Sequence, residues 1–192
     1  MNNVMLDIET MGTACDSVII QVSMIRFDKD GNMGETLSVK INTEEQLALG
    51  AKKYQDTIDW WQKTNPTLFE SLTTGDDILS VKEALNKISA FVFRSDKVWS
   101  HAYFDAPLLG NLYKLAGIQT PWNYKSIRDI RTLTDVANLD LTKYDWAKEK
   151  THDALDDCRF QIKYCTDAMK IIDLYYRTSV QKWDEDNKLT TQ

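Results

Sequence analysis

Alternating apolar and polar positions mark the first element of the chain. Between residues 4 and 10, aliphatic side chains alternate with Met5, Asp7 and Glu9, and a period of two is typical of a β-strand. Asp7 and Glu9 then project from the same face, roughly 6–7 Å apart along the strand. Because apolar residues occur on both faces, we expect this strand to lie in the middle of a sheet that is covered on each side.

The same pattern predicts further strands and then changes period. Residues 18–27 and 36–41 are β-like and are separated by turn-forming residues, so with the first strand they predict an antiparallel meander. From Ser80 the apolar residues recur at helical spacing, which predicts an amphipathic helix capped by Ser80. The remaining predicted elements are helix 57–63, a turn at Asn65-Pro66, strand 97–101, helix 107–115, strand 126–130, a helical turn at 131–137 and helix 153–176.

These elements predict a single α/β domain. Three antiparallel strands followed by alternating helices and strands give a mixed five-stranded sheet, with two further parallel strands and flanking helices. We place this domain at residues 1–183 and expect residues 184–192 to form a polar, disordered tail. Ligand sites in such sheets gather beside the ends of central strands, which is where Asp7 and Glu9 fall.

Composition narrows the class of protein. Of the 192 residues, 43% are hydrophobic and 27% are charged, as in an ordinary soluble globular protein. The net charge of −6 argues against a passive nucleic-acid binder, which is normally basic, unless several of the acids bind cations. We find no run of about 20 apolar residues that would span a membrane and no signal-peptide pattern. The three cysteines lack a zinc-ribbon spacing, so we expect reduced thiols and a cytoplasmic protein.

Two acids on one buried strand need a positive partner. Burying them is costly without one, and hard oxygen ligands suit Mg²⁺ or Mn²⁺. A further acid, Asp105, lies between a predicted strand and a predicted helix, just before Pro107. We interpret Asp105 as a helix N-cap, which is compatible with metal binding because one carboxylate oxygen stays available.

A third acidic stretch begins the last predicted helix. If Asp153 caps this helix, His152 falls on the preceding loop and can fold back towards Asp157. At 100° per residue Asp157 flanks the apolar stripe, whereas Asp156 points to solvent, so Asp157 is the candidate ligand. Asp156 is then a favourable charge near a helix N-terminus. The stripe consists of Leu155, Cys158, Ile162, Cys165, Met169, Ile172 and Tyr176.

In their order and spacing these residues resemble the three-motif signature of the DEDDh 3′–5′ exonucleases. The matching motifs are Asp7-Ile8-Glu9-Thr10, Phe104-Asp105, and His152 followed by Asp157. The resemblance extends over roughly residues 4–176. Within the family, residues 57–61 and 128–132 are similar to the branch of phage exonuclease A and the mycobacterial exoribonucleases.

The resemblance implies a ribonuclease-H-like fold and two-metal hydrolysis of phosphodiester bonds. Asp7, Glu9, Asp105 and Asp157 would hold two Mg²⁺ or Mn²⁺ ions about 3.5–4 Å apart. His152 would act as the general base on the attacking water. The substrate would be single-stranded DNA or RNA, or a 3′ overhang, and the product would be nucleoside 5′-monophosphates.

Candidate substrate contacts also follow from the family. Trp60 and Trp61 point about 100° apart on their predicted helix. Either one packs inward and the other stacks on a base, or both simply cover the edge of the sheet; the family pattern favours Trp61 as the one near the substrate. A stacked base is typically worth about 1–3 kcal/mol. His101 lies where many members have asparagine, and we favour a structural or substrate-contact role for it over catalysis. The other candidates from the family are Thr10, Met11 as an apolar wedge and Gly12 as a point of close approach. The charges of Arg128 and Arg131 are open to two interpretations, as contacts to backbone phosphates or as solvated surface charge.

Two other functions stay open from the sequence. One is a catalytically inactive ribonuclease-H-like module that binds nucleic acid or protein, although such a module has no use for four acids and a histidine. The other is an endonuclease on the same metal platform. The sequence favours neither DNA nor RNA, and a homo-oligomer is compatible with it.

Overall fold

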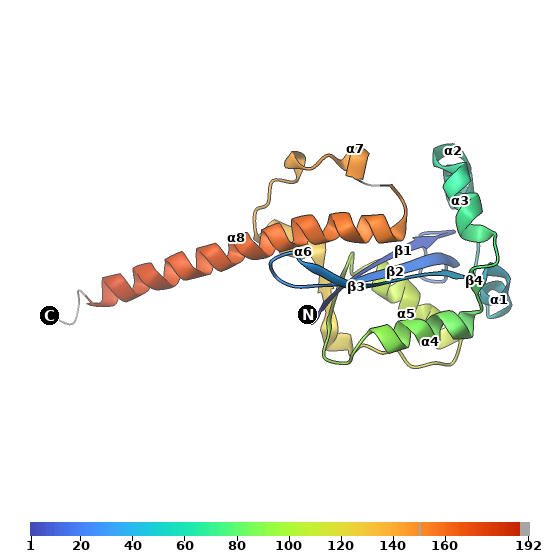
Figure 1. Cartoon of the computed structure of the whole chain (residues 1–192), viewed down its shortest axis with the longest axis horizontal. Helices are drawn as coiled ribbons and strands as arrows, with labels where there is room; N and C mark the ends of the chain where they lie inside the picture. The colour runs from blue at the N-terminus through green and yellow to red at the C-terminus, as the bar shows by residue number, and fades with distance from the viewer. Residues whose placement is uncertain (150, 189–192) are drawn as a thin grey trace.

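A six-stranded mixed sheet forms the centre of the molecule (Figure 1). The computed structural model describes residues 1–149 and 151–188. The strands are β1 (Asn3–Thr10), β2 (Ile19–Phe27), β3 (Met33–Ile41), β4 (Ile78–Leu79), β5 (Lys97–Ser100) and β6 (Ile127–Asp129). Their order is β4-β3-β2-β1-β5-β6. The β1–β2 and β2–β3 pairs are antiparallel, whereas β1–β5, β5–β6 and β3–β4 are parallel.

The prediction of five strands is therefore wrong by one. The additional strand, β4, pairs with Lys40 and Ile41 at the edge of the sheet. Two residues are too few to show a hydrophobic period, so the sequence pattern misses this strand. The predicted central position of β1, between the meander and the later parallel strands, is confirmed.

Helices cover both faces of the sheet. They are α1 (Thr43–Ala48), α2 (Gln55–Thr64), α3 (Pro66–Thr73), α4 (Val81–Phe91), α5 (Asp105–Leu115), α6 (Ile130–Val136), α7 (Trp146–Glu149) and α8 (Ala154–Lys188). Short 3₁₀ helices lie at Tyr124–Ser126 and Leu141–Lys143. In Figure 1, α8 crosses one face of the sheet, and α4 and α5 lie against the other.

The two faces of β1 build two separate cores. Val4, Leu6 and Ile8 belong to the cluster that packs against α4 and α5. Met5 instead belongs to the cluster under α8. Side chains alternate between the faces of a strand, so the acids of β1, which follow Met5 at intervals of two, point to the side of α8.

Capping side chains mark the starts of several helices. Ser80 and Glu83 form the predicted capping box of α4, and Asn65 caps α3, which begins at Pro66. The N-cap interpretation of Asp105 is wrong. The N-cap of α5 is Phe104, and the Asp105 carboxylate instead accepts a hydrogen bond from the His101 backbone N–H at 2.9 Å.

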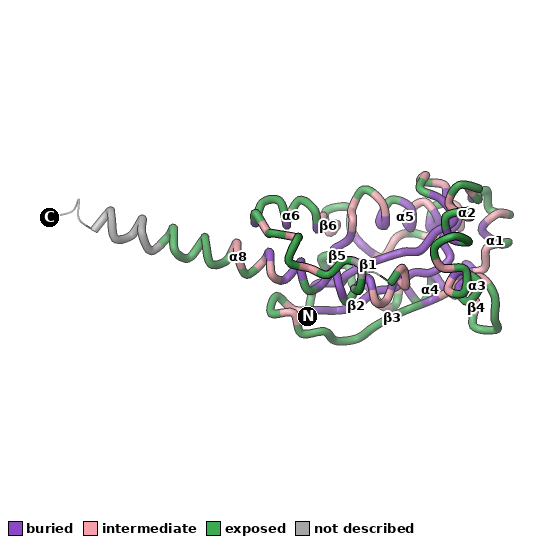
Figure 2. Tube along the Cα trace, turned by 90° about the horizontal axis from the view of Figure 1, so that it is seen from above, coloured by how far each residue is buried: buried purple, intermediate pink, exposed green. Residues whose placement is uncertain are grey.

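Helix α8 is longer than predicted and passes the edge of the sheet. It spans 35 residues and continues to Lys188, so the tail expected from residue 184 begins inside this helix, and residues 189–192 lie outside the described part. Residues 173–180 are exposed (Figure 2). Tyr176, which the sequence pattern assigned to the apolar stripe of this helix, is 69% exposed. The stripe continues along α8 beyond the end of the sheet that covers its first part. Among the described residues, no helix combines the length and apolar character needed to cross a membrane.

Candidate active site

The acids of β1 lie beyond the point where β5 separates from it. Strand β5 pairs only with residues 3–5 of β1, after which the chain turns into the loop that leads to α5. A pocket of about 220 Å³ opens there. Its lining includes both histidines and the four acids predicted as ligands, namely His101, His152, Asp7, Glu9, Asp105 and Asp157.

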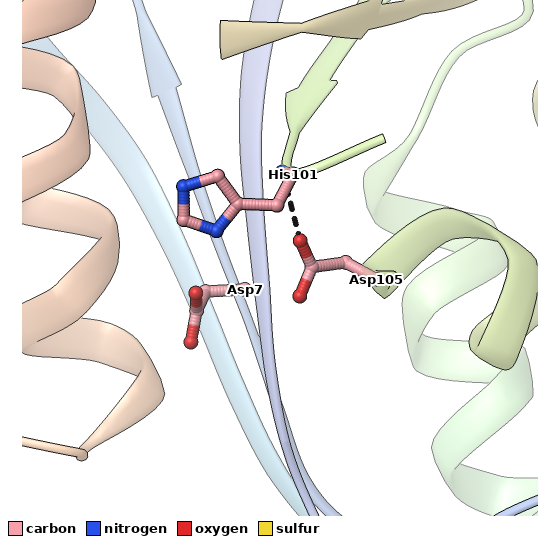
Figure 3. A group of neighbouring side chains, drawn as sticks. All are labelled: Asp7, His101 and Asp105. Atoms are coloured by element: carbon pink, nitrogen blue, oxygen red, sulfur yellow. Dashed lines mark hydrogen bonds between the residues drawn. The ribbon is translucent and has the colours of Figure 1, made fainter. Parts of the chain in front are cut away.

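The donor atoms in this pocket form two groups of three. One group is Asp7, His101 and Asp105 (Figure 3), and the other is Glu9, His152 and Asp157; within each group the donor atoms lie within 4.8 Å of one another. All four carboxylates are buried, with Asp105 only 1% exposed. The structure thus brings together all five residues predicted to be catalytic and adds His101.

Burial sets the protonation of Asp105. Desolvation raises the pKa of its carboxyl group to about 7, although N–H groups of the backbone and the positive charge of Arg131 act in the opposite direction. An isolated carboxylate at this position would be costly. A proton or a bound cation would therefore stabilise Asp105 in this position.

The start of α8 holds the third acidic motif as predicted. The Asp153 side chain accepts hydrogen bonds from the backbone N–H groups of Leu155 and Asp156, at 3.0 and 3.3 Å. His152 lies just before the helix with a φ of 61°, in the left-handed region. Asp157 is 4% exposed and accepts from the Thr151 backbone N–H at 3.1 Å.

Helical phase correctly separates the neighbouring acids. The Asp156 side chain is 48% exposed and forms an ion pair with Arg159, whereas Asp157 lines the pocket. Asp156 therefore lies outside the site.

Two glutamines that the sequence analysis missed organise the site. Gln21 lies opposite Glu9 in the sheet; it accepts from the Ala154 backbone N–H at 2.9 Å and donates to Asp153 at 3.1 Å. Gln21 thereby ties the start of α8 to β2. Gln161 donates to Asp7 Oδ1 at 2.5 Å. It lies one helical turn after Asp157, on the same face of α8.

The two tryptophans of α2 take opposite roles from those expected. Trp61 is 1% exposed and donates its Nε1–H to the Thr10 carbonyl at 2.9 Å. The expectation that Trp61 faces the substrate is therefore wrong, because its ring is part of the core with Phe69. Trp60 is the exposed one, at 41%, and its ring centroid lies 4.9 Å from that of His152.

The residues after β1 are also more enclosed than expected. Met11 is 5% exposed and packs in the same cluster as Trp61, so its side chain is not an available wedge. A Cβ at Gly12 would lie 2.3 Å from Tyr54 Cδ2, so the close approach that requires glycine is to Tyr54. The Thr10 hydroxyl donates to the Gly12 carbonyl at 2.6 Å.

The two arginines predicted as phosphate contacts lie in different positions relative to the pocket. Arg131 is exposed and lines the pocket. The guanidinium of Arg128 donates to the backbone carbonyls of Lys125 and Ile127, at 2.7 and 2.9 Å, and is not among the lining residues. Trp146, which the sequence analysis did not select, is 38% exposed and lines the pocket.

The donor set fits divalent cations. Buried carboxylates in one pocket repel one another unless positive charge lies between them, and oxygen donors suit Mg²⁺ and Mn²⁺. Gln161 Oε1 is buried on the pocket wall and accepts no hydrogen bond from any described residue. A hydrated cation would supply the donor that such an acceptor needs.

Comparison with known proteins places the chain in a family. Residues 2–169 match the family described as the 3′-5′ exoribonuclease Rv2179c-like domain. The chain belongs to this family. The matched range contains the four acids and both histidines of the pocket.

The individual relatives and solved structures share low sequence identity with the chain. The chain is 23% identical to an exodeoxyribonuclease of Enterobacteria phage T4, over 82% of this chain and 85% of the relative. The zinc-bound E. coli ExoI–ssDNA complex is similar in fold, with a TM-score of 0.61 and 17% identity over 90% of this chain and 40% of that one. The Mg²⁺- and Mn²⁺-bound form of S. pombe Pop2p gives a TM-score of 0.54 and 12% identity, over 86% and 82% of the two chains. The chain thus spans less than half of the exonuclease I chain that it matches.

Proposed function

We propose that this protein is a metal-dependent 3′–5′ exonuclease. It would hydrolyse phosphodiester bonds from the 3′ end of single-stranded DNA or RNA, or of a 3′ overhang, and release nucleoside 5′-monophosphates. The observation that carries the proposal is the pairing of four buried carboxylates with two histidines in one pocket. The family and the T4 relative support the same reaction class.

The four acids are the proposed metal ligands. Asp7 and Asp105 would hold one cation, and Glu9 and Asp157 the other. Bound there, Mg²⁺ or Mn²⁺ would polarise the scissile phosphate and make the attacking water more acidic. The zinc-bound form of E. coli ExoI and the Mg²⁺- and Mn²⁺-bound form of Pop2p support the use of metal ions by this fold.

His152 is the proposed general base. It lies beside Glu9 and Asp157 on a loop at the wall of the pocket. As the water oxygen bonds to phosphorus, His152 takes the water proton at an imidazole nitrogen. The bond from phosphorus to the 3′ oxygen of the preceding nucleotide breaks, and that oxygen leaves with the shortened strand.

Aromatic and basic side chains around the pocket suit a single strand. Trp60 and Trp146 offer exposed rings on which a base can stack. Arg131 adds positive charge on the pocket wall, which suits contact with a phosphate. Without a strand partner, bases are available for such stacking, so we propose single-stranded ends as the substrate.

Labelled oligonucleotides test the proposed reaction. Metal-free protein should leave DNA and RNA strands intact, and Mn²⁺ or Mg²⁺ should start stepwise shortening of 5′-labelled strands. Strands labelled in the 3′-terminal nucleotide should release a labelled 5′-monophosphate at once. Degradation that survives EDTA would overturn the metal-dependent mechanism.

The same assay separates the alternatives. A strand with a blocked 3′ end should resist an exonuclease, whereas internal cuts would identify an endonuclease on the same platform. Binding of strands without any cleavage, with Mn²⁺ present, would identify an inactive binding module. Parallel DNA and RNA strands of one sequence measure the preference between the two sugars.

A further inference from the structure

His101 occupies a fixed position beside two of the proposed ligands. It follows the last residue of β5 and lies on the loop that leads to Asp105 at the start of α5. The hydrogen bond from its backbone N–H to Asp105 holds the two residues together (Figure 3). One imidazole nitrogen belongs to the group in which the donor atoms of Asp7, His101 and Asp105 lie within 4.8 Å of one another.

The imidazole ring presents one nitrogen to the carboxylates. Its Nε2 lies 3.5 Å from the Tyr164 hydroxyl on α8. Figure 3 shows the other ring nitrogen, Nδ1, on the side of Asp7 and Asp105. In the tautomer with the proton on Nε2, the lone pair of Nδ1 faces the acids. A cation held by these acids would favour this tautomer, because the other would present an N–H to positive charge.

A second observation also indicates a ligand in this group. Gln161, 4% exposed, holds Asp7 through its amide N–H. Its Oε1 is buried at the pocket without a hydrogen-bond donor among the described residues. Buried acceptors of this kind are normally satisfied, and water on a bound metal ion is a donor that fits a wall of carboxylates.

We propose that His101 is a nitrogen ligand of the cation held by Asp7 and Asp105, and that it makes this site prefer Mn²⁺ or another transition metal over Mg²⁺. The inference rests on the proposed metal-dependent function. Carboxylate oxygens alone suit Mg²⁺, whereas an imidazole nitrogen raises affinity along the transition-metal series. His101 thus determines which metal the site selects.

The two histidines are assigned different tasks because their surroundings differ. His101 is held by a backbone hydrogen bond to a neighbouring ligand. His152 lies on a loop and packs against Trp60, and a general base must keep its lone pair for the proton of water. We therefore assign metal binding to His101 and proton transfer to His152.

Pulsed electron paramagnetic resonance of bound Mn²⁺ tests the inference without any nucleic acid. A directly bound imidazole gives a ¹⁴N coupling, and the chain contains two histidines. The coupling should occur in the wild type and in His152→Asn, and disappear in His101→Asn. Loss of the coupling in His152→Asn, or its persistence in His101→Asn, would overturn the inference.

Calorimetry on the same metal-free proteins measures the selectivity. His101→Asn should lower Mn²⁺ affinity by roughly tenfold or more, a range typical of altered metal sites, and change Mg²⁺ affinity little. Equal losses for both metals would contradict the selectivity. If His101→Asn fails to fold, the comparison of wild type with His152→Asn still identifies the nitrogen ligand. Wild-type protein that binds no Mn²⁺ would overturn the proposed function, whereas Mn²⁺ bound without nitrogen coupling would overturn only this inference.

Discussion

The imidazole of His152 lies edge to face against the indole of Trp60, with ring centroids 4.9 Å apart and an interplanar angle of 84°. The two residues come from distant parts of the chain, on the α2 helix and on the loop before α8. Trp60 therefore limits where the proposed base can move. This restraint matters because the backbone of His152 is left-handed, a conformation that persists only where the surrounding structure supports it.

Replacing Trp60 should impair catalysis more than folding. With 41% of Trp60 exposed, Trp60→Ala should melt close to the wild type. Its single-turnover rate with Mn²⁺ and a short DNA strand should fall by roughly tenfold or more, because small displacements of a catalytic group are costly. Trp60→Phe keeps an aromatic face and should recover most of the rate. Full activity of Trp60→Ala would show that neither the His152 contact nor base stacking matters.

The neighbouring tryptophan is the matched control. Trp61 is buried and hydrogen-bonded to Thr10, so Trp61→Ala should cost about 3–5 kcal/mol of unfolding free energy. Denaturant unfolding of both alanine variants measures the contrast. Equal destabilisation by the two substitutions would contradict the assignment of Trp61 to the core and Trp60 to the rim.

The sequence predicts those parts of the site that depend on local pattern. Alternation in β1 is enough to place Asp7 and Glu9 on one face, and helical phase is enough to select Asp157 over Asp156. Both periods are fixed by backbone geometry. These predictions hold because a strand or helix carries its side chains in a fixed direction whatever packs against it.

The predictions that were wrong concern features that depend on tertiary contacts. Helical phase separates Trp60 from Trp61 by about 100°, yet only the position of α2 against the sheet decides which one is buried. The stripe on α8 continues to Tyr176, but its burial ends where the sheet ends. Gln161 carries no charge and fits no motif, so its contact with Asp7 becomes visible only when α8 lies over β1.

Substitutions at the adjacent acids of α8 should differ sharply. Asp156→Asn removes an exposed ion pair with Arg159, which is typically worth about 0.2–1 kcal/mol, so activity and Mn²⁺ binding should change little. Asp157→Asn removes a buried proposed ligand and should abolish most of the rise in melting temperature that Mn²⁺ gives to the wild type. Melting scans with and without Mn²⁺ compare them. Similar losses in both variants would contradict the orientation of this helix.

Asp105 should make the metal-free protein less stable at high pH. Burial raises the pKa of this carboxyl in the folded state to about 7, from an ordinary value of 3.8. Between these values the folded state binds more protons than the unfolded state, so the contribution of Asp105 to stability falls as pH rises. In EDTA, Asp105→Asn should therefore be more stable than wild type at pH 8, with the difference shrinking towards pH 4. Denaturant unfolding at both pH values measures it, and a difference independent of pH would contradict the raised pKa.

Gln161 should act on metal binding rather than on folding, and Gln46 supplies the matched control. Gln161→Met removes the N–H that holds Asp7 and also a buried acceptor without a partner, so the two effects on stability oppose each other. Its Mn²⁺ affinity should fall by roughly 10–100-fold, as when other residues that orient metal ligands are replaced.

Gln46 is fully buried and bonds the backbone N–H and carbonyl of Ile19, at 2.9 and 2.7 Å. Gln46→Met leaves both groups unpaired and should cost about 1–3 kcal/mol for each, with unchanged Mn²⁺ affinity. Calorimetry measures the Mn²⁺ affinity of both variants, and denaturant unfolding measures their stability. A Gln161→Met protein that loses stability but keeps its Mn²⁺ affinity would show that Gln161 is a packing residue.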